Sequence, residues 1–288
     1  MRIALGLEYD GSAFCGWQSQ AQACGVQDHL QSALSQLAAE PIAVTAAGRT
    51  DAGVHAAAQV VHFDTNAERS DSAWVRGTNA TLHPAARVVW ARETSVEFHA
   101  RYGALSRTYR YVLVNDPVAP ALLRGRVGWH HRPLDLEPMA QALALLEGEH
   151  DFSAFRDAEC QAKTPVRRLM RARVERVRDT FLFSFRANAF LHHMVRNIVG
   201  AAVYVGSGRR PPQWLGELLA GRDRRLGAPT FAPDGLYLAA VEYDPAFGLP
   251  AFRAAAHLDV TPAVDVTPAV DVTPAVDVTP AKAGAQFP

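Results

Sequence analysis

The segment 46–56 carries the residue types best suited to do chemistry. It reads Ala-Ala-Gly-Arg-Thr-Asp-Ala-Gly-Val-His-Ala, with one carboxylate, Asp51, between Gly48 and Gly53, and Arg49 two residues before it. Glycine adopts positive φ at little cost, and short polar residues bond their own backbone, so this pattern predicts a sharp turn that presents Asp51 and Arg49. A lone Asp-x-Gly more often marks a capped surface turn. The small and apolar neighbours of this one predict a partly enclosed site.

A second candidate stretch is 190–200, Phe-Leu-His-His-Met-Val-Arg-Asn-Ile-Val-Gly, in which Arg196 stands among apolar residues at helical spacing. A buried arginine needs an anionic partner, and Asp51 is the natural candidate. The adjacent His192 and His193 suggest a metal site. Neighbouring residues on a helix diverge by about 100°, however, so we expect these two not to share an ion, and we predict no metal.

Arginine and aromatic residues interleave in two places in a way that suits RNA. Guanidinium groups bond phosphates bidentately, and aromatic rings stack on unpaired bases. The run 163–178 holds only one acidic residue, Glu175, among its arginines. A solvated strand face would also explain the charge. The first cluster consists of Arg101, Tyr102, Arg107, Tyr109, Arg110 and Tyr111.

Composition predicts a folded protein of one large or two ordinary domains, since 49% of the 288 residues are hydrophobic. Formal net charge is zero, but 248–288 carries two basic and four acidic residues, which leaves the body positive. The cysteines, Cys15, Cys24 and Cys160, form no CxxC pair, so we expect a reducing compartment and no structural zinc. No signal peptide and no apolar run near 20 residues is found, so we expect a cytoplasmic protein without membrane association.

Periodicity predicts interleaved strands and helices, and therefore an α+β fold with sheet layers covered by helices. A hairpin turn is expected at Asp179-Thr180, and the repeated Asp-Val-Thr-Pro-Ala-Val from Asp259 to about Pro280 predicts an extended, mobile tail without function. Strands are expected at 3–9, 59–64, 87–91, 106–114, 173–178, 181–186 and 236–243, and helices at 26–40, 74–79, 136–146 and 190–205, with another opening at Pro211-Pro212.

The segment 48–56, GRTDAGVHA, resembles the catalytic motif of the TruA family of tRNA pseudouridine synthases. Further stretches similar to the family follow the same order along the chain, and the likeness covers nearly everything from residue 1 to about 243. The tail has no counterpart in the family pattern. The further stretches are DGSAFCGWQ (10–18), SRTYRY (106–111), HDFSAF (150–155), 190–200 and PDGLYL (233–238).

The resemblance implies a pseudouridine synthase fold. Its two α/β-sandwich, ferredoxin-like halves are joined through an extended mixed, mainly antiparallel sheet, with helices on one side and a central basic cleft. We expect an N-terminal domain at 1–104, a C-terminal domain at 105–247 and a disordered tail at 248–288. The implied activity is isomerisation of uridine to pseudouridine at positions 38, 39 and 40 of the tRNA anticodon stem-loop. Cofactor and metal are not expected, and the partners are tRNA and a second copy of the chain.

The resemblance also implies roles for single residues. Asp51 acts as a nucleophile at C1′ or as the base that removes the 2′ proton, and the sequence does not choose between them. Tyr109 stacks against the target base or is a strand core residue. Arg49 takes part in extruding the nucleotide or only clamps phosphate, and Arg196 pairs with Asp51. Alternatives are a non-catalytic tRNA-binding or chaperone protein with the same cleft, and a small-molecule hydrolase that uses Asp51 and a histidine. His55 and Phe152 are expected to be architectural.

Overall fold

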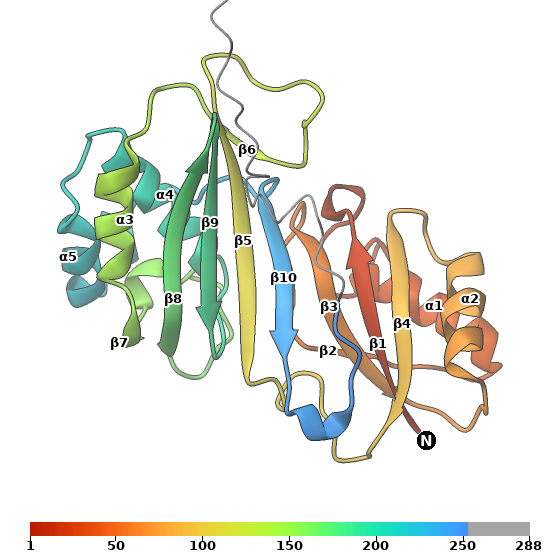
Figure 1. Ribbon diagram of the computed structural model, residues 1–288. Helices are drawn as coiled ribbons and strands as arrows, with labels where there is room; N and C mark the ends of the chain where they lie inside the picture. The colour runs from red at the N-terminus through yellow and green to blue at the C-terminus, as the bar shows by residue number, and fades with distance from the viewer. Residues whose placement is uncertain (253–288) are drawn as a thin grey trace, which may run out of the picture.

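A computed structural model describes residues 1–252, which form a ten-stranded sheet with helices grouped at its two ends (Figure 1). The strands are β1 (Arg2–Tyr9), β2 (Thr45–Ala46), β3 (His55–Asp64), β4 (Ala86–Thr94), β5 (Ser106–Asn115), β6 (Gly128–His130), β7 (Gly148–Asp151), β8 (Val166–Val177), β9 (Thr180–Ala187) and β10 (Leu236–Glu242). The α-helices are α1 (Val26–Ala38), α2 (Asp71–Thr81), α3 (Leu136–Ala144), α4 (Met194–Gly206) and α5 (Trp214–Gly221).

Strand β10 joins the two halves of the sheet, whose order is β4-β1-β3-β10-β5-β9-β8-β7. It pairs in parallel with β3 and antiparallel with β5, and most other pairs are antiparallel. In this register Leu238 lies opposite Ala56 on one side and opposite Tyr109 on the other. The join therefore brings the start of β3, which follows the Asp51 turn, close to the Tyr109 strand. The expected α+β fold with a mixed sheet is confirmed.

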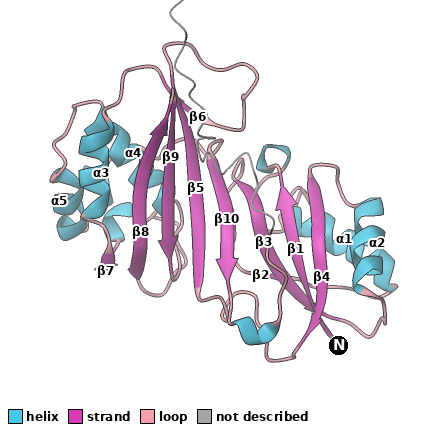
Figure 2. Ribbon diagram, in the orientation of Figure 1, coloured by secondary structure: helices cyan, strands magenta, loops and turns pink. Residues whose placement is uncertain are grey.

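The helices cover one face of the sheet, because alternate residues of each strand are apolar on that side. In β1, Ile3, Leu5 and Leu7 belong to the large core shared with the helices, whereas Ala4 belongs to a smaller cluster on the other face. Helices α1 and α2 lie at one end of the sheet, and α3, α4 and α5 at the other (Figure 2). The middle strands β3, β10 and β5 thus lie between two groups of helices.

Loops cover part of the opposite face. Phe98 packs edge-on against Tyr243 and Phe247, and Phe252 packs against Trp90 with ring centroids 5.5 Å apart. The first residues of the expected tail at 248–288 therefore contact the sheet. Its remainder, including the Asp-Val-Thr-Pro repeat, lies outside the described residues. The domain boundary at 104/105 stays a prediction, and no helix within 1–252 has the length and apolar character needed to span a bilayer.

Most expected elements are found, and the departures have local causes. The hairpin between β8 and β9 turns at Arg178 and Asp179, one residue earlier than expected, because Arg178 adopts a left-handed φ of 54°. Helix α4 begins at Met194, four residues later than expected, because His193 has a φ of 60° that a helix cannot include. This late start changes where the histidines point.

Helix α4 packs closely on the segment that follows α5, at Gly200. A Cβ built at Gly200 would lie 2.4 Å from the carbonyl oxygen of Pro229. We predict that Gly200→Ala lowers the free energy of unfolding by roughly 1–3 kcal/mol, because a backbone atom must move to accept the methyl group. Chemical denaturation monitored by circular dichroism measures this.

The control is Gly221→Ala at the end of α5, where a built Cβ meets nothing within 4 Å. Alanine improves helix propensity there, so stability is expected to be unchanged or slightly raised. Equal stability of the two variants would contradict the close packing at Gly200.

Candidate active site

Asp51 lies in a turn immediately before β3, as the sequence predicts. The N–H of Val54 donates to the Asp51 carbonyl at 3.1 Å, and Gly53 has a φ of 79°. A Cβ built at Gly53 would lie 2.8 Å from Pro233 Cγ, so both the conformation and the space require glycine there. Gly48, in contrast, is not among the glycines with positive φ. Only one of the two glycines therefore has the expected backbone role.

Hydrogen bonds from several elements hold the backbone of this turn. Gln59 Nε2 donates to the Gly48 carbonyl at 2.7 Å, and the N–H of Trp17 donates to the Thr50 carbonyl at 2.9 Å. The Thr50 hydroxyl shares a hydrogen bond of 2.9 Å with Tyr9 Oη. Bonds from three directions fix the turn before any ligand arrives, which is the preorganisation a reacting group requires.

Arg107 supports the same turn from inside the protein. Its guanidinium donates to the carbonyls of Ala47 at 2.9 Å, Ala104 at 3.1 Å and Asn188 at 2.8 Å, and also to that of Arg101. The residue is 7% exposed, and burial lowers the pKa of its guanidinium. The sequence pattern places Arg107 in a cluster suited to RNA. Its bonds show a structural role instead.

The expected pairing of Asp51 with Arg196 is confirmed. Arg196 Nη1 donates to Asp51 Oδ2 at 3.1 Å, and its Nε donates to the Phe231 carbonyl at 2.8 Å. The side chains are 14% exposed for Arg196 and 23% for Asp51. The second bond fixes the guanidinium, so the carboxylate is held in one orientation while part of it stays accessible.

His192 and His193 both face Asp51, contrary to the expectation that they diverge. Their Nε2 atoms lie 3.2 Å and 3.3 Å from Asp51 oxygens, and their rings stack with centroids 3.9 Å apart. The expectation is wrong because both residues precede α4, so the 100° rotation between helical neighbours does not apply. The only signal in the sequence was the His-His pair itself.

Asp157 is a member of the site that the sequence did not reveal. It accepts a hydrogen bond of 2.7 Å from His193 Nδ1 and lies 3.6 Å from His192 Nδ1. Burial works against its ionisation, but hydrogen bonds from the Glu159 N–H and from His193 outweigh burial, and the pKa of Asp157 lies below its usual value. No periodicity or motif marks this residue, because its role depends on a contact 36 residues away in the chain.

Tyr109 lies next to the Asp51 turn, on β5. A Cβ built at Gly48 would be 3.7 Å from Tyr109 Oη, and the ring packs edge-on against Phe190 at 5.0 Å. The pKa of Tyr109 is raised mainly by burial, and further by the nearby Tyr9 and by the charge of Asp51. The hydroxyl therefore keeps its proton and can donate it. The ring is 8% exposed, which leaves a base only a small contact in this conformation.

Arg49 is exposed on the Asp51 turn, and its Nη1 lies 3.5 Å from Gln161 Oε1. The arginines of the run 163–178 lie mainly on β8, two strands beyond β5 in the sheet. One of them, Arg173, pairs with Glu147 at 3.5 Å.

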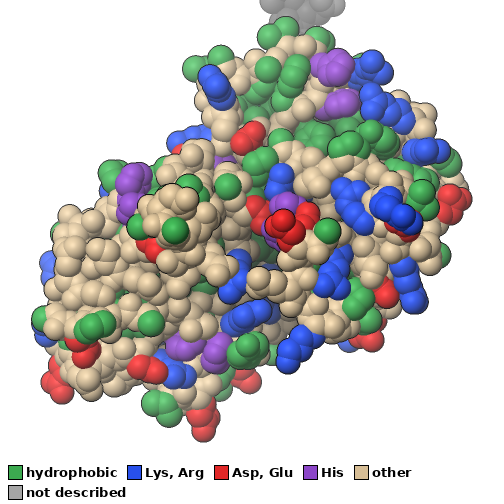
Figure 3. Space-filling model, turned by 180° about the vertical axis from the view of Figure 1, so that it is seen from behind, with side chains coloured by type: hydrophobic (Ala, Val, Ile, Leu, Met, Phe, Trp, Pro, Cys, Tyr) green, Lys and Arg blue, Asp and Glu red, His purple; other side chains and the backbone are tan. Residues whose placement is uncertain are grey.

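Acidic and histidine side chains gather near the middle of the face seen in Figure 3, beside a hollow bordered by Lys or Arg side chains.

The loop that braces the turn contains a disulfide between Cys15 and Cys24, with Cα atoms 5.4 Å apart. The N–H of Cys15 also donates to the Cys24 carbonyl at 3.0 Å. This bond departs from the expectation of a reducing compartment, because the fold of the loop brings together two cysteines that form no CxxC motif. Cys160 is a buried free thiol that accepts a hydrogen bond from the His192 N–H at 3.4 Å.

His55 occupies a structural position, as expected. Its Nδ1 accepts from the Gly11 N–H at 3.0 Å and its Nε2 donates to the Asp234 carbonyl at 3.0 Å. Burial lowers the pKa of His55, so the ring stays neutral with both nitrogens bonded. Phe152 is fully buried beside Phe155.

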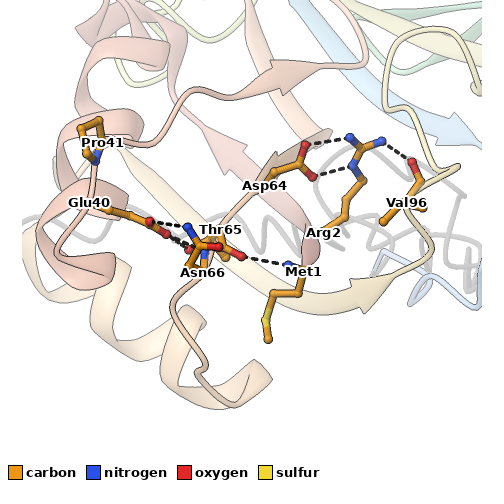
Figure 4. A pocket seen from close by; sticks show the side chains of 8 residues that line it. All are labelled: Met1, Arg2, Glu40, Pro41, Asp64, Thr65, Asn66 and Val96. Atoms are coloured by element: carbon orange, nitrogen blue, oxygen red, sulfur yellow. Dashed lines mark hydrogen bonds and ion pairs between the residues drawn. The ribbon is translucent and has the colours of Figure 1, made fainter.

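A pocket of about 570 Å³ lies far from these residues, at the N-terminal end of β1 (Figure 4). Its charged groups are hydrogen-bonded to one another or to neutral groups that line the pocket. Arg2 donates twice to Asp64 at 2.8 Å, and Glu40 accepts from Asn66 at 2.7 Å. The charged groups of the pocket are thus already engaged in hydrogen bonds, and the Asp51 cluster is the better candidate for chemistry.

Comparison with known proteins agrees with this geometry. A sequence model of the family described as tRNA pseudouridine synthase matches residues 7–103 and 142–244. The tRNA pseudouridine synthase A of Methylobacillus flagellatus is 59% identical over 87% of this chain and 96% of its own length. The proteins of that name from Thiobacillus denitrificans and Nitrosomonas europaea are 60% and 53% identical, over 87% and 90% of the chain and 96% of each relative. This chain therefore belongs to the tRNA pseudouridine synthase family, which is a family of isomerases.

Proposed function

We propose that this enzyme isomerises uridine to pseudouridine at positions 38, 39 and 40 of the tRNA anticodon stem-loop, with Asp51 as the reacting group. The observation that carries the proposal is the rigid turn that presents a partly exposed Asp51 carboxylate aimed by Arg196. By the family resemblance, the enzyme works as a cytoplasmic homodimer, and one tRNA contacts both subunits. Family membership argues against the non-catalytic and hydrolase alternatives.

The reaction breaks one bond to C1′ and forms another. The C1′–N1 bond breaks, the uracil turns, C5 bonds to C1′, and the C5 proton leaves to solvent while N1 gains a proton. Asp51 either attacks C1′ and is later displaced by C5, or removes the 2′ proton and later returns it. Both routes need the carboxylate in a fixed position, which the contact with Arg196 provides.

Access to the reacting carbon requires that the nucleotide leave its stack, at a cost of a few kcal/mol. Arg49 is the exposed cation on the Asp51 turn, so we assign it to the phosphate or to the space the nucleotide vacates. Tyr109 keeps its hydroxyl proton and lies beside the turn, so we assign it a contact with the base and assistance in late proton transfer.

We predict that Asp51→Asn abolishes turnover and leaves tRNA affinity within a few-fold. The amide keeps the shape of the side chain but is a poor nucleophile and base. Tritium release from tRNA labelled at uridine C5 measures turnover, a filter-binding assay measures affinity, and pseudouridine mapping of the product locates the modified positions.

The control for this substitution is Glu93→Gln, which removes an exposed carboxylate from β4 and should change neither quantity. Near-normal tritium release by Asp51→Asn would show that another group reacts. Modification confined to positions outside 38–40 would reject the proposed site specificity and leave the role of Asp51 intact.

A second prediction separates the two arginines of the site. Arg196→Met should lower the free energy of unfolding by roughly 1–3 kcal/mol, because the Phe231 carbonyl and Asp51 lose their donor. Arg49→Met should change stability by no more than about 0.5 kcal/mol, because the side chain is exposed. Turnover should fall in both variants. Thermal unfolding and tritium release measure the two effects, and equal stability losses would contradict the different burial of these residues.

A further inference from the structure

Two imidazole rings and one carboxylate converge within ligand distance of one another. His192 Nε2 lies 3.2 Å from Asp51 Oδ1, and His193 Nε2 lies 3.3 Å from Asp51 Oδ2. One ligand atom from each of the three residues lies within 4.8 Å of the other two. Atoms bonded to a tetrahedral metal at about 2.0–2.1 Å are about 3.3 Å apart, and each histidine lies at about that distance from a different oxygen of Asp51.

Asp157 lies behind the histidines, as a supporting carboxylate does in metal sites. It contacts His193 Nδ1 at 2.7 Å and His192 Nδ1 at 3.6 Å. A carboxylate only accepts hydrogen bonds, so His193 Nδ1 donates to Asp157, while His193 Nε2 faces Asp51. A bond from the second ring nitrogen to a carboxylate orients a histidine for metal binding.

The two histidines face carboxylate oxygens on both sides, with Asp51 near their Nε2 atoms and Asp157 near their Nδ1 atoms. His193 Nε2 lies 3.3 Å from Asp51 Oδ2, and its Nδ1 lies 2.7 Å from Asp157 Oδ2. Arg196 bonds Oδ2, while Oδ1 faces His192. Two carboxylates and one guanidinium surround the imidazoles, and this excess of acidic groups favours a dication.

We propose that Asp51, His192 and His193 form a binding site for a borderline-soft transition-metal dication such as Zn²⁺, and that the ion inhibits the enzyme. The side chains are partly exposed, at 23% for Asp51, 37% for His192 and 22% for His193, so an ion can reach them. Imidazole ligands favour zinc, cobalt and nickel over Mg²⁺, which prefers oxygen. The inhibitory part rests on the proposed function, because the metal would hold the carboxylate that reacts.

The first experiment measures binding without turnover. The tag-free full chain, stripped with EDTA and dialysed, is titrated with zinc chloride by calorimetry and with cobalt chloride by visible absorption. We expect one zinc ion per chain with micromolar affinity, cobalt absorption of tetrahedral intensity, and no binding of magnesium chloride. His192→Ala and His193→Ala should each weaken binding at least 10-fold, and Asp157→Asn about 10–100-fold.

The control uses the second pair of adjacent histidines, His130 and His131. Among residues 1–252 only the Asp51 group brings three such ligands together, so His131→Ala should leave zinc affinity unchanged. Absence of zinc binding to the wild-type chain would overturn the proposal. Equal affinity in wild type, His192→Ala and His193→Ala would overturn it too, since the ion would then lie elsewhere.

Turnover separates this proposal from the proposed function. Zinc should suppress tritium release from labelled tRNA and EDTA should restore it, and Asp157→Asn should need about 10–100-fold more zinc for half-inhibition. A chain that binds zinc as expected but never releases tritium, even in EDTA, rejects the proposed function and keeps the metal site. An active chain whose turnover zinc does not affect overturns the inhibitory role.

Discussion

The contact between Arg196 and Asp51 is the interaction on which the rest of the site depends. It joins the N-terminal end of α4 to the turn before β3, 145 residues away in the chain. A partly buried ion pair loses much of its Coulomb energy to desolvation, so its main effect here is to fix a direction. The turn supplies a rigid backbone, and Arg196 supplies the orientation of the one side chain that the chemistry needs.

The sheet makes this contact possible, because β10 places the two halves in a fixed register. Leu238 lies between Ala56 and Tyr109, so the turn before β3 and the ring on β5 must meet at the join. On the helical side, the close approach at Gly200 holds the segment that carries the Phe231 carbonyl, which in turn fixes Arg196. Packing between helices and loops in one half of the fold thus determines the orientation of the Asp51 carboxylate in the other half.

The sequence predicts the elements and site residues that local patterns mark, but not those whose role depends on contacts between distant parts of the chain. Strands and helices follow from apolar periodicity. Asp51 and Arg196 are recognisable because a charged side chain among small or apolar residues needs a partner or a function. The orientation of His193 depends on a single left-handed residue, which no periodicity predicts. Asp157 is an ordinary surface acid until the fold brings it to the histidines. Strand β8 begins earlier than the sequence predicts, because its exposed arginines hide the alternation of apolar and polar residues.

Arginines show why composition alone is a poor guide to this site. The sequence singles out Arg107, Arg196 and Arg49 in three different stretches, and their burial gives them different roles. Arg107 bonds only carbonyl oxygens in the hydrogen bonds described, which makes it a fixed positive charge beneath the Asp51 turn. Arg196 is committed to one carboxylate and one carbonyl. Arg49 remains exposed on that turn. A phosphate arriving at the turn therefore meets the least buried of the three, while the other two keep the carboxylate in place.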